Sequence, residues 1–218
     1  MHGVLADLHD REYSIERLLN HIVDVGEARG KVDIIVVLKA SLFIALYNNV
    51  EATMYAIAER IHCAASPLHY DDLAPALKTK FLRYSFGKNG GIFMQNRQKI
   101  AEEESKLRSM FTNFPELSEY LRRQSLFSGN VDARKVNLIG ISYGIQKIHF
   151  SKSDAEKMLW VKNKRNKIAH GEQSMSDGGQ GIKTLDLELA SKSIGRILRH
   201  FISAVDSYLT ARAYCNSP

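Results

Sequence analysis

The residues best suited to chemistry lie in one stretch, Val161–Gly171, whose sequence is VKNKRNKIAHG. Four cations fall within six residues of it with no acid among them, and His170 follows directly before a glycine. These cations are Lys162, Lys164, Arg165 and Lys167. Cations also stabilise a helix C terminus by opposing the helix dipole, so a purely structural role for the cluster stays open. The combination with histidine nevertheless points to chemistry at a phosphate, since arginine pairs with phosphate oxygens and histidine exchanges protons near neutral pH.

Cleavage of RNA without a metal requires a base for the ribose 2′-hydroxyl, an acid for the leaving 5′-oxygen and a cation at the phosphate. Because the unperturbed pKa of histidine is about 6.5, His170 is the candidate acid and base, and Arg165 the candidate stabiliser of the transition state. The expected product is a 2′,3′-cyclic phosphate, and DNA should resist because it lacks the 2′-hydroxyl. No cofactor is needed. No metal site is expected, because His62, Cys63 and His69 lack a second cluster that would complete four ligands.

The spacing of Arg165 and His170 constrains how they can act together. Five residues at about 100° each rotate a helix by about 500°, which leaves the two side chains about 140° apart on an ideal helix. One regular helix would not direct both at one phosphate. Either the helix unwinds at Ala169–Gly171, or two copies of the motif meet across a dimer axis. A twofold interface would suffice, because one surface patch then pairs with itself.

The string Arg165-Asn-Lys-Ile-Ala-His170 resembles the motif of the HEPN superfamily, whose nuclease members carry an Arg-x(4–6)-His pattern, often with a polar residue after the arginine. The run Leu38–Ala52, LKASLFIALYNNVEA, is similar to the long second helix of that family. On an all-helical chain the extended string is more specific than the Arg-x4-His pattern alone, which arises often by chance.

The resemblance implies an all-α, HEPN-like helical bundle with a long second helix, forming one domain over residues 1–218. Its core would span about 1–65 and 130–212, with a partly helical insertion at about 66–129. A lid, a dimer arm and a partner-docking surface all fit this insertion. The resemblance further implies a homodimer that cleaves RNA, of a larger subfamily found near toxin–antitoxin and phage-defence loci.

The same resemblance bears on protein partners. An antitoxin or a defence-system protein would control such a nuclease. Some HEPN toxins carry a tyrosine two residues after the motif histidine, which the antitoxin modifies, but Glu172 occupies that position here. Neutralisation by that modification is therefore not expected, and control by another partner stays open.

Three polar residues next to Arg165 in the sequence, or two positions from it, are candidates for supporting roles. Asn166 would hydrogen-bond the phosphate or position His170, and the alternative is a polar helix residue that faces water. Lys164 and Lys167 would add positive field and salt-sensitive contacts to RNA. The sequence Gly178-Gly-Gln-Gly181 lacks the surroundings of a phosphate loop and indicates a flexible connector close enough to contact substrate.

A carboxylate from another part of the chain could also support the site. Glu51 lies at helical spacing between Tyr47 and Tyr55 in an otherwise aromatic stripe. As a carboxylate it could orient Arg165. An exposed helix edge is the simpler explanation for its position, and both interpretations stay open.

The composition is that of a folded globular protein, with 44% hydrophobic and 25% charged residues in a chain of 218. Thirty Lys and Arg against 24 Asp and Glu give a net charge of +6, which gently favours an anionic partner such as nucleic acid. Two distant cysteines fit a reducing compartment. No secretory signal is visible, and Lys39 interrupts the most apolar run, Ile34–Tyr47. We expect a cytoplasmic protein that does not contact membrane.

Helices must position the motif, because apolar residues recur at helical spacing and the chain has only four prolines. The longest pattern, Val32–Ala65, carries a seam of Leu42, Leu46, Val50, Met54, Ile57 and Ile61. Four other patterns indicate a first helix ending near Gly26 and Gly30, a short helix from Val136 to Gly144, a helix from Ser153 to about His170, and a final helix containing Ile194–Leu209. The capping-box spacing of Ser153 and Glu156 marks the start of the motif helix. Glu172–Lys183 is predicted to be a loop.

Two functions from other classes stay open. A HEPN-like module without catalysis would bind RNA or a nucleotide through the same cationic helix, without turnover. A dimeric helical scaffold would hold a partner protein and show no salt-dependent affinity for RNA, and Arg165→Ala would then alter stability or assembly.

Overall fold

The computed structural model describes residues 1–26, 31–87, 90–127 and 129–216, and all regular structure in these ranges is helical apart from two isolated bridges. The helices are α1 (His2–Gly26), α2 (Val32–Ala65), η1 (Tyr70–Asp72), α3 (Pro75–Ser85), α4 (Gly90–Phe93), α5 (Arg97–Ser109), α6 (Leu117–Arg123), α7 (Ala133–Ser142), α8 (Lys152–Ala169), α9 (Met175–Gly179) and α10 (Thr184–Thr210). The all-α prediction is confirmed. Gly30 lies outside the described residues.

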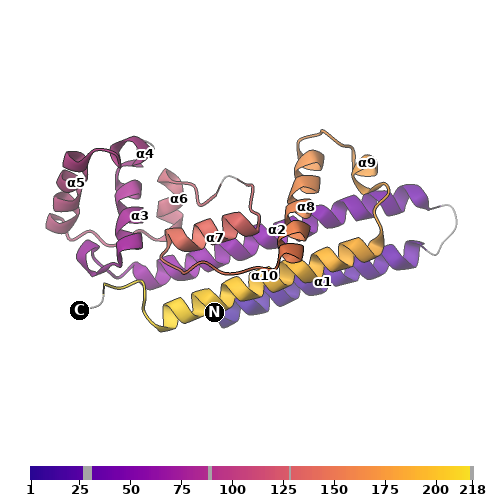
Figure 1. Cartoon of the computed structure of the whole chain (residues 1–218), viewed down its shortest axis with the longest axis horizontal. Coiled ribbons are helices and arrows are strands. Elements are labelled where there is room, and N and C mark those ends of the chain that lie inside the picture. Colours follow the sequence, from indigo (N-terminus) through magenta and orange to yellow (C-terminus); the bar gives the residue numbers. More distant parts are fainter. Residues whose placement is uncertain (27–30, 88–89, 128, 217–218) are drawn as a thin grey trace.

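Three long helices form the body of the molecule, with α1 running opposite to α2 and α10 (Figure 1). The predicted seam of α2 is buried along its whole length, and Val50 and Ile61 are fully inaccessible. By length and apolar composition α2 could also cross a membrane. Within the described chain it is the central core helix, packed against α1, α8, α9 and α10.

Shorter helices stand on α2. In the view of Figure 1, α3 and α6 rise on the side of α2 away from α1 and α10, and α8 runs from α10 across α2 to that side. Residues 66–129, predicted to be a partly helical insertion, contain η1 and the helices α3 to α6 in their described parts. Aromatic side chains of this segment, such as Tyr70, Phe81 and Phe114, are buried and pack in the same core as the apolar residues of α2. The site helix α8 packs on α2 and α10.

Two local predictions are wrong. The motif helix is capped by Ser151, whose hydroxyl accepts from the Asp154 amide, and not by Ser153. The stretch Glu172–Lys183 is not simply a loop, because it contains α9.

A buried histidine joins α2 to the 66–129 segment. The His62 ring is within 2.8 Å of the Pro115 carbonyl oxygen and 2.9 Å of the Tyr143 hydroxyl, and the residue is inaccessible to solvent. Burial is the main cause that lowers the pKa of His62 to about 4, with the charge of Lys80 acting in the same direction. His62 therefore stays neutral in the folded protein at physiological pH.

This lowered pKa predicts acid sensitivity. Unfolded His62 takes up a proton near pH 6.5 and the folded form only near pH 4, so the free energy of unfolding should fall between these values, by up to about 3 kcal/mol. Urea unfolding across this range should show the slope in the wild type and in the exposed control His21→Gln. In His62→Gln the fall in the free energy of unfolding across this range should be smaller by up to about 3 kcal/mol. An unchanged fall would contradict the assignment of the acid sensitivity to His62.

Candidate functional site

Arg165 lies against two side chains of α2. Its guanidinium carbon is 4.5 Å from the centre of the Tyr47 ring, and Nη2 is 3.5 Å from Glu51 Oε2. Tyr47 and Glu51 are one turn apart, so they face α8 side by side. The side chains of Arg165 and Glu51 are 21% and 23% exposed. The helix-edge interpretation of Glu51 does not describe this position, since its carboxylate contacts the arginine.

The hydrogen bonds of Arg165 leave donors for a ligand. Besides the pair with Glu51, Nη1 donates to Asn166 Oδ1 over 3.2 Å. A guanidinium has five N–H donors, and these two contacts engage only part of them. Arg165 is therefore oriented by Tyr47 and Glu51 while it can still bind a phosphate.

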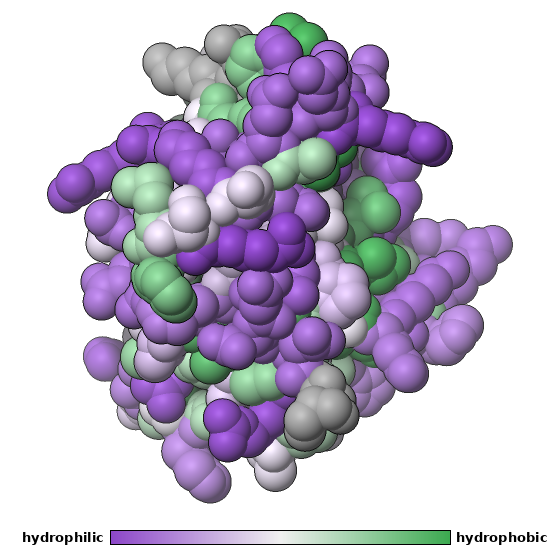
Figure 2. Space-filling model, turned by 90° about the vertical axis from the view of Figure 1, so that its left-hand side faces the viewer, coloured by the Kyte–Doolittle hydropathy of each residue, from purple (hydrophilic) through white to green (hydrophobic). Residues whose placement is uncertain are grey.

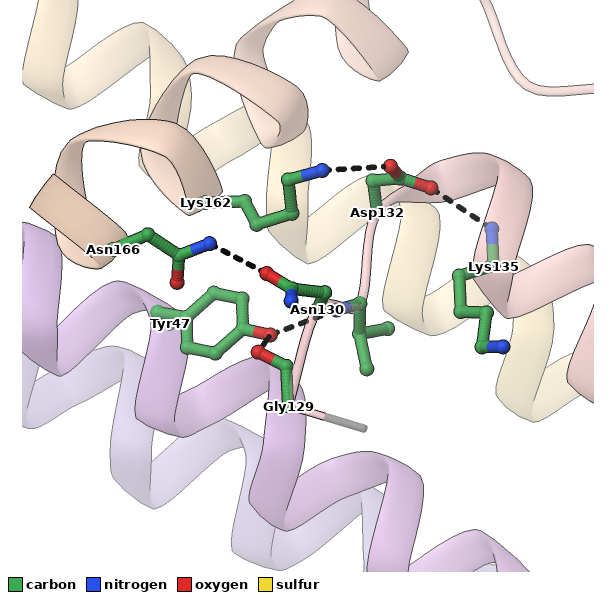
Figure 3. Close-up of polar contacts among 8 residues, drawn as sticks. Tyr47, Gly129, Asn130, Asp132, Lys135, Lys162 and Asn166 are labelled. Carbon is green, nitrogen blue, oxygen red and sulfur yellow. Dashed lines mark hydrogen bonds and ion pairs between the residues drawn. The ribbon is translucent and has the colours of Figure 1, made fainter. Parts of the chain in front are cut away.

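The segment 129–132 is fixed beside Arg165 by the Tyr47 hydroxyl (Figure 3). This hydroxyl donates to the Gly129 carbonyl oxygen over 2.6 Å and accepts from the Val131 amide over 2.7 Å. Burial is the main cause that raises the pKa of Tyr47, which keeps the hydroxyl proton in place for the first bond. Gly129 has a φ of +68°, which favours glycine.

Two contacts from α8 hold the same segment (Figure 3). The Asn166 side-chain amide donates to Asn130, and Lys162 Nζ is 3.1 Å from Asp132 Oδ2. Asp132 also caps α7 by accepting from the Lys135 amide over 2.9 Å. Burial acts to raise the pKa of Asp132, but the bonds from Lys135 and Lys162 lower it overall. Segment 129–132 is thus part of the site, with Asn130 exposed at its surface.

His170 lies at the exposed end of α8. The helix ends at Ala169, one residue before the predicted limit, and Gly171 follows with a φ of +74°. The His170 backbone amide still bonds the Asn166 carbonyl over 2.9 Å. Within the described residues its imidazole makes no hydrogen bond or ion pair, and none joins it to Arg165. The chain therefore presents an anchored arginine and an exposed histidine, with no hydrogen bond between them in the described structure.

The remaining cations of the motif have different surroundings. Lys162 pairs with Asp132, and Lys164 Nζ donates to the Gly178 carbonyl over 3.4 Å. Lys167 is exposed. Two of the four predicted cations therefore hold neighbouring segments of the chain in place.

The glycine-rich stretch is not a flexible connector. Gly178 and Gly179 are buried in α9, which packs on α2. A Cβ at Gly179 would lie 1.8 Å from the Val36 carbonyl oxygen, so only glycine permits this approach. Lys39 secures the following turn by donating to the Ile182 carbonyl over 2.6 Å. This packing fixes the chain that continues from His170.

Sequence reasoning missed two contributors to the site, Tyr47 and Asn130. Tyr47 stood in the aromatic stripe beside Glu51, which was the only available signal. Asn130 offered none, because its contact with Asn166 spans 36 residues. No group of three or more His, Cys, Asp or Glu side chains in the described chain could hold a metal ion.

Comparison of the sequence with known protein families identifies the family of this chain. Residues 3–214 match the sequence model of a family described as MAE_28990-like HEPN. The chain belongs to the HEPN superfamily. No curated protein and no solved structure shows significant similarity to it. The match covers both ends of this HEPN chain and the 66–129 segment between them.

The Tyr47 hydroxyl supplies a direct test of the site's construction in this HEPN protein. Tyr47→Phe keeps the ring under Arg165 but leaves the Gly129 carbonyl and the buried Val131 amide without their partner. Unfolding in urea should show a loss of about 1–3 kcal/mol. Tyr55→Phe, on the same helix but exposed, is the matched control and should lose less than about 0.5 kcal/mol. Equal losses in the two variants would contradict this role for the hydroxyl.

Proposed function

We propose that this HEPN protein is a metal-independent endoribonuclease in which Arg165 stabilises the transition state and His170 transfers protons. The observation that carries the proposal is the fixed guanidinium of Arg165, held by Tyr47 and Glu51, five residues before an exposed histidine. The HEPN family match supports an RNA-related role.

The proposed reaction begins with removal of the proton from a ribose 2′-hydroxyl by a neutral His170. The 2′-oxygen attacks the adjacent phosphorus, and negative charge builds on the phosphate oxygens, where the Arg165 guanidinium donates hydrogen bonds. The bond to the 5′-oxygen breaks, and a protonated histidine supplies the leaving group's proton. The products are a 2′,3′-cyclic phosphate and a 5′-hydroxyl end.

Two protomers are proposed to build this site together. Arg165 packs toward α2 while His170 faces solvent at the end of α8, so a second copy is the simplest source of the missing partner for each. A twofold axis would bring Arg165 of one protomer toward the histidine of the other and would generate two equivalent pairs. Lys167, which is exposed and lies between Arg165 and His170 in the sequence, would add salt-sensitive attraction for RNA.

We place this activity in a toxin or antiviral effector of the cytoplasm, controlled by an antitoxin or a defence-system partner. Asn166 would act by orienting Arg165 and fixing Asn130, in line with its two side-chain contacts. Lys164 would act indirectly, by securing α9 through Gly178.

The test is cleavage of total RNA in EDTA with analysis of the product ends. His170→Ala should lower the cleavage rate by about 10²- to 10⁴-fold, because it removes proton transfer. Its thermal unfolding should be unchanged, since the imidazole is exposed and bonds no described residue. His149→Ala, at another exposed histidine, is the matched control and should cleave as the wild type does.

The outcomes separate the functions. Cyclic phosphate ends from the wild type and His149→Ala, but not from His170→Ala, are the expected result. Cleavage that persists in His170→Ala contradicts the assignment of the histidine. Binding of RNA without any turnover by the wild type would favour the non-catalytic module, and absence of salt-dependent RNA affinity would favour the scaffold.

A further inference from the structure

A second cationic surface lies on the 66–129 segment. Arg83 is in the last turn of α3, and Arg122 and Arg123 are in the last turn of α6. All three are exposed, and none forms an ion pair with an acid of the described chain. We call these residues the arginine patch. Arg108, which is also exposed, differs because it pairs with Asp71.

Aromatic rings lie among these cations. The Arg123 guanidinium is 5.1 Å from the centre of the Tyr84 ring, and Tyr84 stacks on Tyr120 with centres 6.0 Å apart and planes 19° apart. Lys80 lies 5.4 Å from the centre of the Tyr120 ring and pairs with no described acid. Burial, and then the charge of Arg83, lower the pKa of Lys80 to about 8. Lys80 is buried, so the exposed charge of the patch is that of the three arginines, with Arg83 close enough to act on Lys80.

The two helix ends that carry the patch are joined. Gln124 Nε2 donates to the Arg83 carbonyl over 2.9 Å and to the Gly87 carbonyl over 2.6 Å. Cations at helix C termini oppose the helix dipoles, but this explanation requires neither stacked aromatic rings nor contact between the two ends. Tyr120 is buried, but Tyr84 is partly exposed beside Arg123, and an accessible aromatic ring next to arginine is a combination that binds single-stranded nucleic acid.

Described residues that follow the patch in the sequence contact the elements of the candidate site. The Phe127 ring centre is 4.8 Å from that of the exposed Tyr55 on α2, and Asn130 bonds Asn166 on α8. From Gln124 to Asn130, six residues span at most about 20 Å, a distance that about six stacked nucleotides cover. In Figure 1, α6 and the free end of α8 lie on the same side of α2.

The end of the molecule formed by α3, α4 and α5 has a mainly hydrophilic surface, with apolar residues in small separate areas (Figure 2). An apolar protein partner would need a broader apolar face there. The surface suits a polyanion better.

We propose that the arginine patch binds a single-stranded stretch of the RNA substrate, a few nucleotides away from the phosphate held at Arg165. This inference rests on the proposed function for the position of the cleaved bond, but binding at the patch requires no turnover. It makes the 66–129 segment a substrate-binding arm.

The experiment measures fluorescence anisotropy of labelled single-stranded RNA in the non-cleaving His170→Ala background. Arg122→Glu with Arg123→Glu is compared with Arg17→Glu and Lys192→Glu, an equal change of net charge at exposed sites on α1 and α10. Each is tested with a 20-nucleotide and a 4-nucleotide RNA. A version with both arginines changed to Gln removes the charge without reversing it, and thermal unfolding verifies that each variant is folded.

The patch variants should weaken binding of the long RNA at least tenfold and reduce the salt dependence of log Kd by about 1.4, the value for two phosphate contacts on a single strand. The control pair should change the affinity less than threefold, and the short RNA should not distinguish patch from control. Equal effects of patch and control variants on the long RNA would overturn the inference.

Failure of the proposed function looks different. Wild-type protein that never cleaves RNA, while the patch variants still lose affinity selectively, would refute the nuclease and leave the patch standing. Cleavage by the wild type, together with unaltered RNA affinity in the patch variants, would refute the patch alone.

Discussion

The contact between Tyr47 and Arg165 is the interaction on which the candidate site depends. Tyr47 is buried near the middle of α2, its ring lies under the guanidinium, and its hydroxyl bonds both Gly129 and Val131. One rigid side chain thus fixes α8 and the segment before α7 relative to the central helix. The guanidinium is held by contacts within the chain, so under the proposed function little conformational entropy would be lost on binding a phosphate.

The motif's charge has two uses. Lys162 and Lys164 hold segment 129–132 and α9 in place, whereas Arg165 and Lys167 remain available to a ligand. Counting the four cations as a single RNA-binding patch therefore overstates the charge available at the reaction. Affinity for a long RNA would need cations elsewhere, and the unpaired arginines of α3 and α6 lie where the 124–130 segment connects them to the site.

Burial patterns explain what could be predicted from the sequence. The bounds of α2 and its buried seam follow from apolar spacing, and Arg165 and His170 follow from residue type and spacing. The bond from the Tyr47 hydroxyl to the Gly129 carbonyl could not be predicted, because Gly129 lies 82 residues away in a segment without an apolar pattern. Gly178 and Gly179 were predicted to form a flexible connector, because glycine occurs both in flexible segments and at close contacts between backbones. Only the position of the α2 backbone shows that close packing is the reason here. Both Ser151 and Ser153 precede an acid by three residues. The ion pair of Asp154 with Arg196, a contact between distant parts of the chain, favours Ser151 as the cap over Ser153.

The most direct test of the central claim asks whether Arg165 of one protomer acts with the His170 of another. Chains carrying Arg165→Ala and chains carrying His170→Ala, each inactive alone, are co-expressed with different tags and mixed dimers are purified. Each mixed dimer retains one intact pair of two, so cleavage should return to about half of the wild-type rate per dimer. Mixed dimers as inactive as either parent would contradict a site shared between protomers.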